Sequence, residues 1–190
     1  MLDKKYMAAV RKELLSYAEK RREVIKQAGD AQHMSKRAIF ALQRDNVKEA
    51  EASLEQAGAI LSGLAKKYQK EEGLLDEGSY RASLEEYAEA VLFNSFLKGK
   101  PLGKIPHVEV DADIFVGGLC DVPGEMLRYA IKSATERKFE MVEKCFAAAE
   151  EIIGELVDMD LTGYNRQKFD QAKGALNKLE QVRYEVSLRA

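Results

Sequence analysis

The chain has 190 residues, of which 46% are hydrophobic and 33% are charged, so it is long enough for one domain with its own core. Its 30 Lys and Arg against 32 Asp and Glu leave a formal net charge of -2, which excludes a uniformly basic nucleic-acid-binding protein. The two cysteines, the lack of a long apolar run and an N-terminus charged from Asp3 onward exclude a disulfide framework, a transmembrane anchor and a secretory signal. We expect one soluble cytoplasmic domain over residues 1–190, with no membrane partner.

Apolar residues at helical spacing predict two helices in the first third of the chain. Residues 3–43 are expected to form one long helix, in which Gly29 marks a bend or a break; we favour a single helix. Asn46 is a suitable N-cap, and Glu49 stands at the capping-box position three residues later. A second helix is therefore expected from Asn46 to about Tyr68.

The third predicted helix, from Ser79 to about Leu97, is apolar on two sides. Two acidic residues, Glu86 and Glu89, fall on either side of the direction of Phe93 when successive residues are placed about 100° apart. A helix that is apolar on both sides is normally buried on both sides. The two carboxylates are therefore expected to share a face with a large aromatic ring.

An irregular connection follows over residues 98–116, because two of the three prolines and two glycines interrupt helix formation there. The end of this connection alternates apolar and acidic residues, which favours an extended segment. The next helix is expected to begin at Asp121, after the glycines at 117–118, with Pro123 in its first turn.

Two more amphipathic helices complete the chain, one ending at about Val157 and one running from about Asn165 to Leu188. No repeat of solenoid period is present. The predicted fold is all-α, with about seven antiparallel helices in a single bundle-like domain.

Four acidic residues form the candidate metal site. Glu86 and Glu89 are three residues apart on one predicted helix, and Asp121 and Glu125 are one turn apart on another, so each pair lies on one helix face. Four carboxylates that converge from two helices are costly without a cation, and oxygen ligands suit Mg²⁺ or Mn²⁺. The simpler interpretation is solvated surface charge, with Asp121 and Glu125 complementing the helix dipole and Glu125 paired with Arg128.

Basic residues gather in the first 50 positions, which carry a net charge of +5. Two clusters stand out there: Lys20, Arg21 and Arg22, and Lys36 and Arg37. Such residues either contact nucleic-acid phosphates or form a plain solvated helix face.

Four motifs, in the same order along the chain, resemble those of the translin and Trax (translin-associated factor X) family. Residues 35–40, SKRAIF, resemble the family's first-helix signature, and residues 86–91, EYAEAV, are similar to its E-[FY]-x-E-A-V motif. Residues 118–125 resemble the Trax segment that reads D-L-T-G-E, with Pro123 in place of Thr, and residues 166–184 match the closing helix.

The resemblance implies an all-α subunit that assembles into a hollow octameric barrel enclosing nucleic acid. It also implies a Mg²⁺-dependent endoribonuclease site facing the interior, with Glu86, Glu89 and Asp121 as catalytic carboxylates and Glu125 as a further metal ligand. Translin-type subunits, which bind single-stranded RNA or DNA, lack the aspartate, so Asp121 indicates the Trax-like branch. The short chain favours a homo-oligomer.

Two hypotheses follow for the function. The first is a metal-dependent endoribonuclease for single-stranded RNA, in which the four carboxylates bind Mg²⁺ or Mn²⁺ and five basic residues hold the phosphates: Lys20, Arg21, Arg22, Lys36 and Arg37. The second is a non-catalytic scaffold for single-stranded RNA or DNA, in which the acidic residues are structural and pair with Lys36 or Arg37. An RNA cleavage assay with Mg²⁺ against EDTA separates the two.

Overall fold

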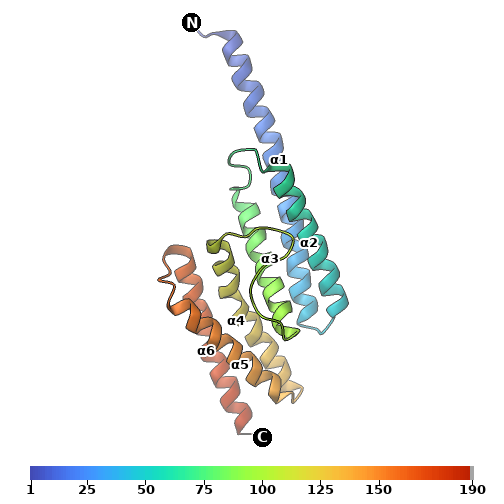
Figure 1. Ribbon diagram of the computed structural model, residues 1–190, viewed down its shortest axis with the longest axis vertical. Coiled ribbons are helices and arrows are strands. Elements are labelled where there is room, and N and C mark those ends of the chain that lie inside the picture. Colours follow the sequence, from blue (N-terminus) through green and yellow to red (C-terminus); the bar gives the residue numbers. More distant parts are fainter. Residues whose placement is uncertain (189–190) are drawn as a thin grey trace.

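Six helices make up most of residues 1–188, the part of the chain that the computed structural model describes, and this part contains no β-strand (Figure 1). The all-α prediction is confirmed, with six helices against the expected count of about seven. In chain order the helices are α1 (Lys4–Leu42), α2 (Val47–Tyr68), α3 (Gly78–Leu97), α4 (Ala112–Thr135), α5 (Phe139–Val157) and α6 (Gly163–Ser187). Within residues 1–188, none of the helices is both long and apolar enough to cross a membrane.

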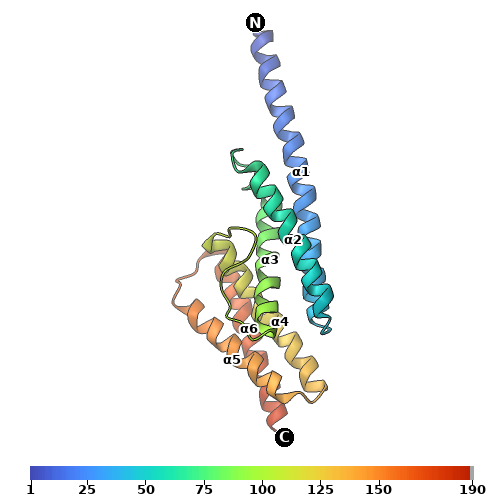
Figure 2. The same ribbon diagram turned by 45° about the vertical axis from the view of Figure 1, so that its right-hand side comes forward.

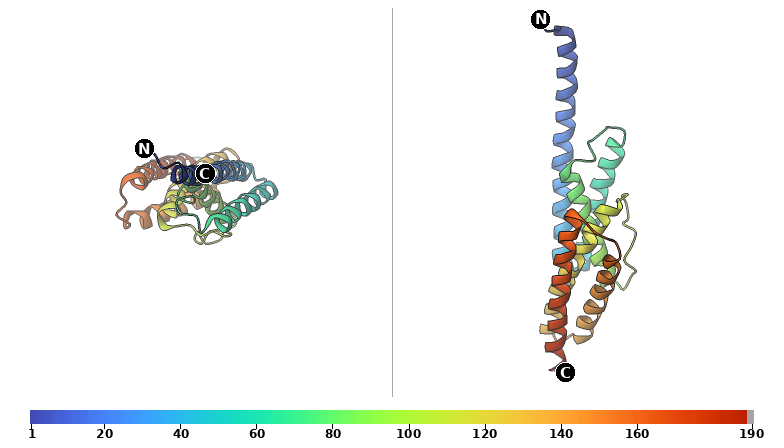
Figure 3. Two further views of the ribbon diagram at one scale, coloured as in Figure 1. Left: turned by 90° about the horizontal axis from the view of Figure 1, so that it is seen from above. Right: turned by 90° about the vertical axis from the view of Figure 1, so that its left-hand side faces the viewer.

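Helix α1 is a single continuous helix that passes through Gly29 without a break, as predicted. The Asp3 side chain caps it by accepting hydrogen bonds from the Lys5 and Tyr6 amides. Its N-terminal half projects beyond the other helices (Figures 1 and 3). Its buried residues begin at Val24, so the C-terminal half packs against α2 and α3.

Helix α3 lies at the centre of the molecule, between the α1–α2 hairpin and α4 (Figure 2). Large side chains that point to different sides of it, including Tyr87 and Phe93, are fully buried. This confirms the prediction of a helix buried on two sides. Some polar residues on α3 are therefore buried, Glu89 among them, and others such as Glu85 and Glu86 are partly covered by neighbouring helices.

Helix α4 begins at Ala112, so the prediction that a helix starts at Asp121 is wrong. The Asp111 side chain caps α4 by accepting a hydrogen bond of 2.8 Å from the Ile114 amide. Pro123 consequently lies inside the helix, where a proline forfeits one backbone hydrogen bond. Asp121 and Glu125 are mid-helix residues, and they do not complement the helix dipole of a first turn.

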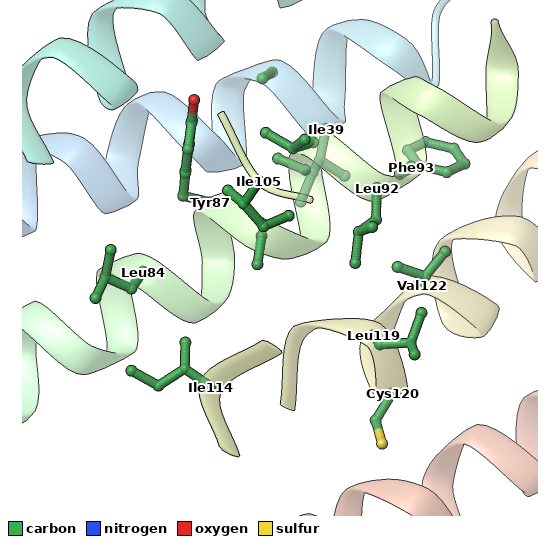
Figure 4. Packing of buried hydrophobic residues seen from close by; sticks show 14 of the residues in the cluster. Ile39, Leu84, Tyr87, Leu92, Phe93, Ile105, Ile114, Leu119, Cys120 and Val122 are labelled. Carbon is green, nitrogen blue, oxygen red and sulfur yellow. The ribbon is translucent and has the colours of Figure 1, made fainter. Parts of the chain in front are cut away.

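Close packing against α3 explains why the glycines before Asp121 are helical. A Cβ added at Gly118 would lie 2.8 Å from the Glu85 carbonyl oxygen and 3.0 Å from the Glu89 nitrogen. A side chain there would therefore push the two helices apart. Figure 4 shows the apolar layer that the close approach permits, in which α3 and α4 side chains lie between the two ribbons: Leu84, Leu92, Ile114, Leu119 and Val122.

Helices α3 and α4 run in the same direction, because the connection over residues 98–111 returns along the length of α3 (Figure 1). The contacts between them follow this order. Gly118 lies against Glu85 near one end, and the Phe93 and Tyr129 rings meet edge to face at 6.1 Å near the other. Helices α5 and α6 pack on α4 and close the bundle on that side.

Candidate carboxylate and nucleic-acid site

The parallel packing of α3 on α4 brings the four predicted acidic residues together. Gly118 fixes the contact at Glu89, and Asp121 and Glu125 follow one and two helical turns further along α4. Each of Asp121, Glu86 and Glu125 repels the charge of Glu89 strongly enough to raise its pKa. The four carboxylates therefore share one site at the α3–α4 interface.

Glu89 is the innermost of these residues, with 8% of its surface exposed. Its carboxylate makes no side-chain hydrogen bond or ion pair with any residue in the described part of the chain. Burial, with repulsion from the three neighbouring carboxylates, raises the pKa of Glu89 to about 9. In the absence of a cation, Glu89 is thus protonated at neutral pH.

A buried lysine on α6, Lys168, also belongs to the site, and the sequence analysis gave it no role. Its Nζ lies 2.7 Å from Oε1 of Glu85, forms a second ion pair with Asp121 and donates to the Gly117 carbonyl at 3.3 Å. Burial alone would lower the pKa of Lys168, but its hydrogen bonds to Asp121 and Glu85 outweigh this and raise the pKa above its usual range. Lys168 therefore remains charged and ties α6 to both α3 and α4.

The spacing of the last helix contains a signal for Lys168. It lies four, seven and eleven residues before Ala172, Ala175 and Leu179, which are all buried, so it falls on the inward face of α6. A lysine at an inward position needs a buried partner. The sequence alone does not identify Asp121 as this partner, because the position of α4 relative to α6 is known only from the fold.

Two of the four carboxylates also contact side chains at the C-terminal end of α1, one from Lys36 and one from the C-cap residue Gln43. Lys36 Nζ lies 3.6 Å from Oε2 of Glu86, which is the pairing that the scaffold hypothesis predicts. Gln43 Nε2 donates to Oε2 of Glu125 at 2.7 Å, and Arg128 contacts the same carboxylate at 3.1 Å. The predicted Glu125–Arg128 pair is therefore present. Burial raises the pKa of Glu86 above its usual range, although Lys36 opposes the effect.

The other predicted basic residues do not reach the carboxylates. Lys20 pairs with Glu71 at 2.5 Å and Arg21 with Glu77 at 2.6 Å, and Lys20 lies about 24 Å from Lys36 along α1 at 1.5 Å per residue. Of the five predicted basic residues, the structure therefore places only Lys36 at the carboxylates. Of the other two, Arg37 pairs with Glu49 at 3.1 Å, and Arg22 is exposed far along α1.

The four carboxylates are the kind of ligand that a hard divalent cation prefers, although their side chains are not arranged in a coordination geometry. Within residues 1–188, no group of three or more His, Cys, Asp or Glu side chains is arranged to hold a metal ion. The four carboxylates offer only oxygen donors, which Mg²⁺ and Mn²⁺ prefer. Glu89 is buried beside them without a partner, and a bound cation would replace the proton that Glu89 holds in its absence.

These features define the class of protein: an all-helical bundle with a group of carboxylates, one buried and three partly exposed, between two parallel helices. The sequence model of the Translin family matches residues 19–190, and the chain belongs to this family. A search of curated proteins found no sequence match.

Solved structures confirm the fold. The chain is similar to the crystal structure of apo-NeC3PO, with a TM-score of 0.87, 21% identity and 98% of each chain covered. It is also similar to AfC3PO, with a TM-score of 0.85, 23% identity and coverage of 97% of this chain and 98% of that one. The AfC3PO–duplex RNA complex gives a TM-score of 0.84 at 22% identity, with 97% of each chain covered.

Proposed function

We propose that this protein is an endoribonuclease that hydrolyses single-stranded RNA with the help of Mg²⁺ or Mn²⁺. The observation that carries the proposal is the environment of Glu89. This carboxylate is buried, has no partner among residues 1–188 and faces three other carboxylates, an arrangement that lowers stability unless a cation is bound.

In this proposal Glu86, Glu89 and Asp121 are the catalytic carboxylates and hold the cation, with Glu125 as a further ligand. A bound cation would polarise the scissile phosphate and lower the pKa of a water molecule. A Glu86 oxygen that does not contact the cation would take the proton from the attacking water. The water oxygen would then bond to phosphorus and one bridging P–O bond would break. The leaving oxygen would take a proton from solvent water, and Glu86 would release its proton to solvent.

Two lysines support the carboxylates in different ways. Lys168 contacts Asp121 and Glu85 from α6 and holds the Asp121 side chain in place. Lys36 is more than half exposed next to Glu86, so it is free to turn towards an RNA phosphate. Lys20, Arg21, Arg22 and Arg37 remain predicted phosphate contacts that lie outside the carboxylate cluster.

RNA as the substrate is supported by family membership and by the likeness to AfC3PO, one structure of which is a complex with duplex RNA. We infer that this chain takes single-stranded RNA, and single-stranded DNA as a second ligand, inside a hollow homo-oligomer, an octamer, with the carboxylates facing the interior. Such a chamber would exclude bulk water from the site and strengthen its electrostatic contacts.

The alternative is a non-catalytic scaffold for single-stranded RNA or DNA. The ion pairs of Lys36 with Glu86, Lys168 with Asp121 and Arg128 with Glu125 favour it, because they give three of the four carboxylates a partner without a metal. Glu89 is the residue for which the scaffold hypothesis has no explanation.

Cleavage of a labelled single-stranded RNA in Mg²⁺ and in EDTA tests the proposal. The wild-type protein should cut in Mg²⁺ only. Glu89→Gln should abolish cutting and retain binding, while Glu150→Gln, which changes an exposed carboxylate on α5, should cut normally. Normal cutting by Glu89→Gln would refute the assigned site, and a gel shift without products from the wild-type protein would support the scaffold.

A further inference from the structure

An exposed aromatic side chain, Phe40, lies at the edge of the carboxylate site. It is on α1, and 55% of its surface is exposed although both flanking residues, Ile39 and Ala41, are buried. Single exposed aromatic residues are normal on protein surfaces, so a role for Phe40 depends on what surrounds it.

The contacts of the neighbouring turns place Phe40 relative to the site. Lys36, one turn before it, contacts Glu86, and Gln43, one turn after it, contacts Glu125. At about 100° per residue, Phe40 lies about 40° around α1 from Lys36 and about 60° from Gln43, on the solvent side of both. The ring therefore lies beside the face of α1 that contacts Glu86 and Glu125, and it points away from the core.

A guanidinium group covers this ring. Cζ of Arg44 lies 3.2 Å from the centre of the Phe40 ring, and Arg44 makes no ion pair with any acidic residue among residues 1–188. No acidic side chain in the described part of the chain pairs with its charge, whereas Arg37, in the last two turns of α1, pairs with Glu49. The result is a stacked aromatic–guanidinium pair with an available positive charge.

We propose that Phe40 and Arg44 form a stacking platform for an unpaired nucleobase of the bound RNA. Nucleobases stack on aromatic rings and on guanidinium planes, and a nearby positive charge attracts the adjoining phosphate. A base within a duplex is already stacked and paired, so the platform selects single-stranded RNA. The inference rests on the proposed function, because it names the group that holds the strand next to Glu86.

Binding measurements in the Glu89→Gln background test the platform without interference from cleavage. The probe is a fluorescently labelled, mixed-sequence single-stranded RNA, with its complementary duplex as a second probe. Phe40→Leu, which keeps apolar bulk but removes the aromatic face, should weaken single-strand binding about tenfold. Phe40→Trp should retain it, and duplex binding should change less than twofold. Tyr6→Leu, an exposed aromatic at the far end of α1, is the matched control and should bind normally.

Two results would overturn the platform. The first is equal single-strand binding by Phe40→Leu and the unsubstituted protein. The second is a change in molar mass by light scattering for Phe40→Leu that accompanies the loss of RNA affinity, because the ring would then pack against a second copy of the chain. Failure of the proposed function is separate: the wild-type protein would cut no RNA, while Phe40-dependent binding would still support the platform.

Discussion

Lys168 on α6 reaches the Glu85 carboxylate on α3, with 2.7 Å between Nζ and Oε1, and pairs at the same time with Asp121 on α4. Three helices that are distant in sequence thus meet at one buried residue, Lys168, which has 8% of its surface exposed. This contact links the stability of the bundle to the geometry of the proposed active site.

Replacing Lys168 with Met should lower the free energy of unfolding by about 3 kcal/mol, because it leaves two carboxylates at the interface without their cation. Urea denaturation in EDTA measures the change. Lys173→Met is the matched control on α6, since Lys173 is exposed and its pair with Asp170, at 2.9 Å, contributes less than about 1 kcal/mol. Equal losses in the two variants would show that the Lys168 contacts are not structurally important.

A methyl group at Gly118 should disrupt the α3–α4 contact. Gly118→Ala places a Cβ 2.8 Å from the Glu85 carbonyl oxygen, so we expect a loss of about 1–3 kcal/mol and weaker RNA cleavage. Gly124→Ala on the same helix has no atom within 4 Å of the added Cβ and should gain about 0.5–1 kcal/mol from better helix propensity. Thermal unfolding should show a lower melting temperature for Gly118→Ala and a higher one for Gly124→Ala than for the wild-type protein. A higher melting temperature for Gly118→Ala would contradict the proposed close packing of α4 on α3.

The raised pKa of Glu89 predicts a specific dependence of stability on pH. Between its ordinary value of 4.5 and about 9, the folded protein holds a proton that the unfolded chain releases. The free energy of unfolding in EDTA should therefore fall as the pH rises through this range, and Glu86 and Asp121, whose pKa values are also raised by burial, act in the same direction.

Glu89→Gln removes the largest part of this effect. In EDTA at about pH 8 the variant should have a larger free energy of unfolding than the wild-type protein. The difference should shrink towards about pH 4, where the Glu89 carboxyl is mostly protonated in both the folded and the unfolded wild-type chain. Urea denaturation at both pH values measures it. A variant less stable than wild type at about pH 8 would mean that the Glu89 carboxylate is favourably paired in the folded protein.

Helical periodicity predicted most of the fold, because the apolar faces of α1, α2, α5 and α6 are regular. The predicted start of α4 was wrong because Gly117, Gly118 and Pro123 normally interrupt helices. In this protein the glycines permit close packing of α4 on α3, and these tertiary contacts outweigh the local cost of the proline. Within the site, the spacing of Glu86 and Glu89 identified one acidic face. The partnership of Lys168 with Asp121 joins residues far apart in sequence, so only the fold reveals it.

Binding of Mn²⁺ is the measurement that tests the central claim most directly, and electron paramagnetic resonance of the free ion reports it without requiring activity. At neutral pH the wild-type protein should bind Mn²⁺ with a saturable stoichiometry, Mg²⁺ should compete, and Glu150→Gln should behave like wild type. Glu89→Gln and Asp121→Asn should each lose this binding. Equal Mn²⁺ binding by wild-type protein and Glu89→Gln would contradict the assignment of a cation to these carboxylates.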